Sequence, residues 1–189
     1  ALERHECFLL PWLDGPPQTN EAGRSWGFAA AMLWLVERGC PADFALFELG
    51  SSAGINLMMD RYRYDLGGVR VGPDDAVMRI VPEWRGAPPP FATLRIVSAE
   101  GCDVAPVDLT DPEQALRLRA YIWADQFTRL ARFDESVSVA LAAQVPDSRR
   151  PLRTQEVPAP LREVVVTIER DRLADLTAPP LGGYSLGIG

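Results

Sequence analysis

The stretch FALFELGSSAGIN, residues 44–56, decides the fold. Residues 44–49 are a short apolar run between Asp43 and Gly50, and this length and these flanks are typical of a buried strand. A loop with two glycines follows, and we predict a helix from Ser52 to about Arg61. A strand, a tight loop and a helix in this order favour an α/β fold.

The loop fits the nucleophile elbow of serine hydrolases, G-x-S-x-G, with Ser52 as the nucleophile. In hydrolases of that fold the histidine of the triad follows the serine in the chain. The single histidine of this chain is His5, which precedes Ser52. A serine hydrolase acting through GSSAG is therefore the less favoured hypothesis.

The same loop also fits a ligand-binding turn between a strand and a helix. Such a turn exposes backbone N–H groups, and Gly50 and Gly54 let a ligand approach the backbone. Glu48 lies near the carboxyl end of the strand, where ligands bind in open α/β sheets. An acid there suits a cationic amine better than a phosphate, which points to the methionine end of S-adenosylmethionine. The alternative is a plain turn whose glycines serve geometry alone.

A second acid is expected after the next strand, to hold ribose hydroxyl groups. Residues 92–98 are predicted to form that strand, and Glu100 and Asp103 follow it. We predict that Asp103 shares one pocket with Glu48, because acids at the carboxyl ends of neighbouring strands face one crevice. The alternative is that Asp103 caps a turn before Pro106.

The rest of the chain alternates predicted helices and strands. Only three core strands are convincing, namely 44–49, 92–98 and 164–168. The other predicted elements are a helix over 20–38 capped by Asn20, a β-hairpin over 61–71, a strand over 76–81, a proline linker over 86–90, a helix from Asp111 to about Phe133 that resumes toward Ala143, a linker over 146–160, and a frayed tail over 181–189.

Composition limits the classes of protein. The 189 residues carry a net charge of −7, which argues against nucleic acid as a partner. Three widely spaced cysteines suit free thiols in the cytoplasm and favour neither a disulfide scaffold nor a metal site. No apolar run approaches the length that spans a bilayer, ~20 residues. We therefore expect no metal, no membrane contact and a small-molecule ligand, while the oligomeric state stays open.

A polar cluster precedes the first long helix. Asn20, Glu21 and Arg24 lie together at its start, and we assign them to substrate binding. The alternative, helix capping and an ion pair, is favoured by their position.

Several segments together resemble a bacterial family, domain of unknown function family 2332. They are QTNEAGRS (18–25), the loop above, DRYRYD (60–65), GCDVAPVD (101–108) and IWADQ (122–126), and the likeness covers residues 18–135. The family resembles the S-adenosylmethionine-dependent methyltransferases, and its members carry a helical region before the QTNE segment. The resemblance implies that this chain, which begins with Ala1, lacks that region.

The hypothesis from the sequence is one α/β domain over residues 1–189, Rossmann-like and of methyltransferase type, with a partly parallel sheet and an inserted β-hairpin. It would bind S-adenosylmethionine and transfer a methyl group to an unknown small acceptor. The alternative is a non-catalytic module of the same fold that binds an adenosine ligand. The residues assigned to the cofactor are Glu48, Gly50, Ser51, Ser52, Gly54, Asn56 and Asp103.

Overall fold

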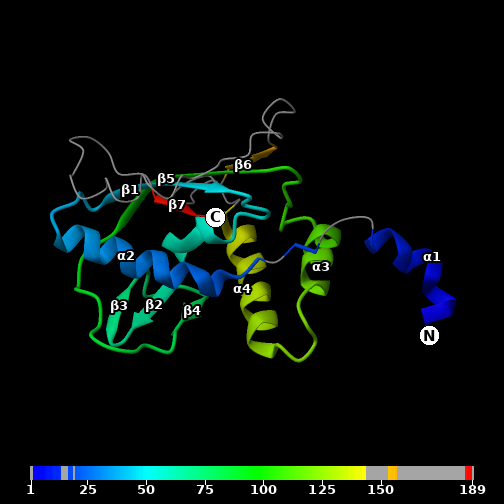
Figure 1. The fold of residues 1–189 in the computed structure, drawn as a ribbon, viewed down its shortest axis with the longest axis horizontal. Coiled ribbons are helices and arrows are strands. Elements are labelled where there is room, and N and C mark those ends of the chain that lie inside the picture. The colour runs from blue at the N-terminus through cyan, green and yellow to red at the C-terminus, as the bar shows by residue number, and fades with distance from the viewer. Residues whose placement is uncertain (1, 14–16, 19, 144–152, 157–185, 189) are drawn as a thin grey trace, which may run out of the picture.

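A computed structural model describes residues 2–13, 17–18, 20–143, 153–156 and 186–188 of the chain (Figure 1). Its helices are α1 (Glu6–Leu9), α2 (Ser25–Glu37), α3 (Pro112–Ala120) and α4 (Phe127–Ala143), with the 3-10 turns η1 (Leu2–His5), η2 (Leu10–Leu13), η3 (Ala22–Arg24) and η4 (Asn56–Arg61). Its strands are β1 (Asp43–Leu49), β2 (Arg63–Leu66), β3 (Val69–Val71), β4 (Arg79–Ile80), β5 (Arg95–Asp103), β6 (Arg153–Glu156) and β7 (Leu186–Ile188). The protein is therefore a mixed α/β structure, as the sequence predicted.

The strands form two sheets. The first has the order β6-β5-β1-β7, and every neighbouring pair in it is parallel. The second has the order β3-β2-β4, with an antiparallel hairpin of β2 and β3 and a parallel pair of β2 and β4. In Figure 1, α2 runs between the two sheets. The hairpin is thus confirmed, and it belongs to a sheet of its own.

One face of the parallel sheet carries the core. Along β1, the side chains of Phe44, Leu46 and Glu48 are buried, and the alternate side chains are exposed. The sequence favoured a strand buried throughout, but Phe47 is 46% exposed and Leu49 is 52% exposed. The buried face packs with apolar residues of α2 and η4, among them Met32 and Leu57.

The predicted helix from Ser52 to Arg61 is wrong in its first half. Ser52 has a φ of 48° and Gly54 a φ of 67°, values that a right-handed helix excludes. The chain turns through residues 51–55 and then makes only the 3-10 turn η4. The loop therefore leads into a 3-10 turn and not into an α-helix.

Other boundaries differ from the prediction in ways that bear on the site. Glu21, not Asn20, caps η3, the turn that leads into α2, because its carboxylate accepts a hydrogen bond from the N–H of Gly23. Strand β5 extends to Asp103, five residues beyond the predicted end at Ser98, so Asp103 is its last residue and not part of a loop. The predicted helix after Asp111 is two helices, interrupted over 121–126, and its cap at Asp111 is confirmed.

The last part of the chain supplies two further strands. β6 lies within 146–160, where the sequence predicted a linker, and it pairs with β5. β7 lies within the predicted frayed tail, 181–189, and pairs with β1. The strand predicted over 164–168 lies outside the described residues.

Candidate functional site

The loop 50–54 follows the carboxyl end of β1, between two parallel neighbours, as predicted. The carbonyl of Cys102 on β5 accepts hydrogen bonds from the N–H groups of Gly50 at 2.8 Å and Ser51 at 3.1 Å. Gly50 has a φ of 69°, in the left-handed region that glycine tolerates without strain. The first half of the loop is thus fastened to the neighbouring strand.

Asp103 holds the second half of the loop. Its Oδ2 accepts a hydrogen bond from the N–H of Ser52 at 2.7 Å, and its Oδ1 accepts one from the N–H of Ala105 at 2.8 Å. The side chain is buried. The bond to Ala105 is the turn cap that the sequence offered as the alternative to ribose binding. The bond to Ser52 fixes a non-glycine residue in a left-handed conformation, which costs on the order of 1–3 kcal/mol and needs such support.

Glu48 is a buried carboxyl group beside this loop. Its Oε1 accepts a hydrogen bond of 2.8 Å from Nδ2 of Asn56, at the start of η4. Burial raises the pKa of Glu48 to about 7, the Asn56 hydrogen bond lowers it, and the nearby charge of Asp103 raises it. The two acids that the sequence singled out therefore lie close enough to interact electrostatically.

Three buried side-chain oxygens around Glu48 make no hydrogen bond within the described residues. They are Oε2 of Glu48, Oγ of Ser51 and Oδ1 of Asn56. All three side chains are at least nine-tenths buried. An unsatisfied buried polar group costs about 1–3 kcal/mol, so hydrogen bonds to these three oxygens would stabilise the site.

Gly101 makes room for this cluster. A Cβ atom at Gly101 would lie 2.5 Å from Oγ of Ser51 and 2.8 Å from a methyl carbon of Leu57. Only glycine lets β5 approach the loop so closely. Sequence reasoning missed Gly101, although its place between Glu100 and Asp103 was the available signal.

The segment 18–24 reaches the loop through two amides. Oε1 of Gln18 accepts a hydrogen bond from Oγ of Ser52 at 3.0 Å, and Nδ2 of Asn20 donates to the carbonyl of Ser51 at 3.4 Å. Gln18 was not among the predicted site residues. Of the three residues predicted to bind substrate, Asn20 contacts the loop. Glu21 and Arg24 instead line a cavity that none of the loop residues 50–54 lines.

A family model described as an uncharacterised protein conserved in bacteria matches residues 1–174. The chain belongs to domain of unknown function family 2332. The match begins earlier and ends later than the resemblance over residues 18–135 that the motifs carried. A search of the curated proteins and a search of the solved structures gave no match. Kinship between family 2332 and the methyltransferases stays a prediction.

The segments that carried the resemblance to family 2332 include those that build this site. QTNE supplies Gln18 and Asn20, and GCDVAPVD supplies Gly101 and Asp103. The DRYRYD segment lies beneath it, because Oη of Tyr62, fully buried, donates to the carbonyl of Ile55 at 2.7 Å. Tyr62 and Tyr64 belong to the core, as their alternation predicted.

One cavity in this member of family 2332 lies away from the loop. It has a volume of about 380 Å³ and is bounded by α2, the hairpin and residues 91–96 at the amino-terminal end of β5. No residue of the loop 50–54 lines it. The loop site is thus identified by its unpaired polar atoms.

Two searches of the described residues gave negative results. No group of three or more histidine, cysteine or acidic side chains is arranged to hold a metal ion. None of the helices found in this part of the chain is long and apolar enough to cross a membrane.

Proposed function

We propose that the carboxyl end of β1 binds S-adenosylmethionine and that the protein transfers its methyl group to a small acceptor. The observation that carries this proposal is the cluster of unpaired oxygens on Glu48, Ser51 and Asn56. A primary ammonium group has three N–H donors and no acceptor, and each of the three unpaired oxygens is able to accept a hydrogen bond. The methionine end of S-adenosylmethionine carries such a group.

The strand order supports a Rossmann-like architecture. Counted along the chain, the parallel sheet β6-β5-β1-β7 has the order 3-2-1-4, which is the order of the first four strands of the doubly wound fold. In that fold ligands bind at the carboxyl ends of the strands, at the point where the order reverses. Here the order reverses between β1 and β7, and Glu48 lies on β1 beside Ile188 of β7.

Glu48 would accept a charge-assisted hydrogen bond from the ammonium group and Asn56 would orient it. Asp103 fixes the loop, and its oxygens have the capacity to accept a further bond each from ribose hydroxyl groups. Methyl transfer from a sulfonium requires mainly proximity and alignment of the acceptor, so the proposal needs no general base in the loop.

A thermal-shift screen tests this proposal. The ligands are S-adenosylmethionine, S-adenosylhomocysteine and NAD. A ligand that binds only the native state raises the unfolding temperature. We expect a rise with the two adenosyl amino acids and none with NAD, which has no primary ammonium group. A rise with none of the three, or with NAD alone, contradicts the proposal.

Catalysis separates the enzyme from the non-catalytic module of the same fold. Both bind S-adenosylmethionine, but only the enzyme releases S-adenosylhomocysteine when an acceptor is supplied. Release of S-adenosylhomocysteine with a library of small nucleophiles therefore decides between them.

One observation favours the serine hydrolase as a second candidate. Ser52 occupies the nucleophile position of G-x-S-x-G and has a φ of 48°, a strained conformation of the kind that exposes an elbow serine. Against it, Oγ of Ser52 donates to Gln18, and His5 lies in η1, ahead of the loop in the chain. We expect no labelling by a fluorophosphonate probe, and labelling that Ser52→Ala abolishes would establish the hydrolase instead.

A further inference from the structure

A second cavity lies among η3, β4 and α4. Its volume is about 230 Å³, enough for a small anionic group but small beside ligand pockets, which begin at ~300 Å³. Its walls are Glu21, Gly23, Arg24, Trp26, Ile80, Pro82 and Arg132. The ring of Trp26 is held edge-on against Trp84, with ring centroids 5.6 Å apart. The cavity thus combines an apolar wall with two guanidinium groups.

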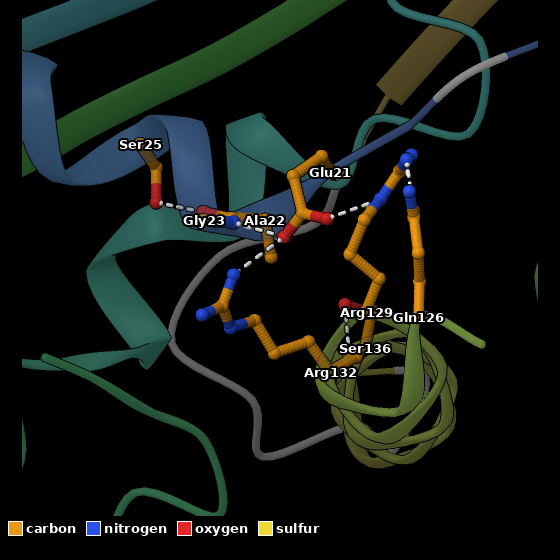
Figure 2. Close-up of polar contacts among 8 residues, drawn as sticks. All are labelled: Glu21, Ala22, Gly23, Ser25, Gln126, Arg129, Arg132 and Ser136. Atoms are coloured by element: carbon orange, nitrogen blue, oxygen red, sulfur yellow. Dashed lines mark hydrogen bonds and ion pairs between the residues drawn. The ribbon is translucent and has the colours of Figure 1, made fainter. Parts of the chain in front are cut away.

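The negative charge of Glu21 is already paired with two arginines. Figure 2 shows the Glu21 carboxylate between the guanidinium groups of Arg129 and Arg132, both on α4. Its Oε2 accepts a hydrogen bond from Nε of Arg129 at 2.7 Å, and its Oε1 accepts one from Nη1 of Arg132 at 3.0 Å. The two positive charges of Arg129 and Arg132 thus exceed the single negative charge of Glu21, and Arg24 adds a third positive charge at the cavity.

Arg132 keeps donors for a further partner. Only its Nη1 donates to Glu21, and no hydrogen bond of its Nε or Nη2 is found within the described residues. Gly23 lets this guanidinium approach the backbone, since a Cβ atom there would lie 2.5 Å from Nη1. Glu135 on the same helix also interacts with Arg132, since burial raises the pKa of Glu135 and the charge of Arg132 lowers it. Three guanidinium groups therefore meet two carboxylates in this region.

The side chain of Arg24 makes no hydrogen bond and no ion pair with any described residue. It is exposed, at the end of η3, and it lines the same cavity as Arg132 of α4. Two guanidinium groups with free donors in the wall of one cavity are suited to bind carboxylate and phosphate oxygens.

We propose that this cavity binds an oxyanion, a carboxylate or phosphate group of a small molecule, between Arg24 and Arg132. Trp26 closes the apolar side, and Glu21 holds Arg132 in place. This site is separate from the loop after β1, and it does not rest on S-adenosylmethionine binding there.

Calorimetric titration of the full chain at constant ionic strength tests the site, with inorganic phosphate in one series and succinate in the other. Saturable binding of phosphate alone indicates a phosphate-bearing ligand, and binding of succinate alone indicates a carboxylic acid. We expect Arg24→Ala to lower the affinity for the anion about tenfold or more, because one charge-assisted hydrogen-bond donor group is lost. Arg24 is exposed, so the unfolding temperature of this variant should stay unchanged.

Arg38→Ala is the matched control. Arg38 is an exposed arginine at the other end of α2, so this variant removes the same charge away from the cavity. It should leave the affinity unchanged. Three results overturn the proposal: no saturable binding of either anion, equal weakening by the two variants, or full affinity in Arg24→Ala.

Discussion

Burial disfavours the ionised form of the Glu48 carboxyl group and so raises its pKa. Its pKa rises from 4.5 to about 7, so the native state binds a proton more tightly than the unfolded chain. When the pKa of an acid is higher in the native state than in the unfolded chain, protonation stabilises the native state at low pH. This contribution is lost as the pH rises through about 7, the native-state pKa of Glu48. A cationic ligand would reverse this effect, because it stabilises the ionised form.

The free energy of unfolding should therefore fall between pH 4.5 and pH 7 because of Glu48, by up to about 3 kcal/mol. The variant Glu48→Gln cannot ionise, so its unfolding free energy should lack this fall. Urea denaturation at pH 5 and pH 8 measures the difference. Glu100→Gln, an exposed acid on the neighbouring strand, is the control and should follow the wild type. Parallel pH profiles of wild type and Glu48→Gln would contradict the assignment.

Asp103 should matter for stability through the backbone. Asp103→Asn replaces one accepting oxygen by an amide nitrogen, so one of the N–H groups of Ser52 and Ala105 loses its partner. We expect a loss of about 1–3 kcal/mol in unfolding free energy. Asp125→Asn, at an exposed aspartate, should cost little. Equal stability of the two variants in urea denaturation would show that Asp103 does not hold the loop.

At the scale of elements, local patterns predicted β1 and the hairpin correctly. The alternation from Arg61 to Leu66 and the glycine pair that follows are signals contained in a few residues. The helix after Ser52 was predicted wrongly, because the fastening of Ser52 to Asp103 is a contact across 51 positions. The full length of β5 was missed for a similar reason, since its end pairs with Leu49 and β6.

The close approach of β5 and the loop gives a prediction for Gly101. Gly101→Ala places a methyl group 2.5 Å from Oγ of Ser51, so the strand or the loop must move. We expect a loss of about 1–3 kcal/mol, the usual cost of overpacking. Gly27→Ala is the control, because nothing lies within 4 Å of its added methyl group, and in the helix α2 it should stabilise by about 0.5–1 kcal/mol. Thermal unfolding compares them, and a neutral Gly101→Ala would refute the close packing.

At the scale of the whole molecule, segments far apart in the sequence meet. Glu21 joins the start of η3 to α4, across 108 positions to Arg129 and 111 positions to Arg132. The sequence offered an ion pair for Glu21 but gave no sign of these partners. The same holds for the strand order β6-β5-β1-β7, since parallel neighbours leave no local signal.

Glu21→Gln tests the bridge between these segments. The variant leaves two guanidinium groups without their carboxylate, and we expect it to lower the unfolding free energy by about 1–3 kcal/mol. High salt should reduce the difference, because the arginines are partly exposed. Glu37→Gln, at an exposed glutamate of α2, is the control. A loss no greater than that of Glu37→Gln would show that the bridge contributes nothing.

The position of the loop after β1 and the closeness of Glu48 and Asp103 were predictable, because a strand followed by a glycine loop fixes where its polar residues lie. That these residues bind a ligand stays a prediction. The central proposal for this site is that Glu48 binds the ammonium group of S-adenosylmethionine. Calorimetric titration of wild type, Glu48→Gln and the control Glu100→Gln with this ligand at pH 8 tests it most directly. We predict saturable binding that Glu48→Gln weakens by about tenfold to a hundredfold and Glu100→Gln leaves unchanged. A flat titration of the wild type, or equal affinity in wild type and Glu48→Gln, would contradict the account.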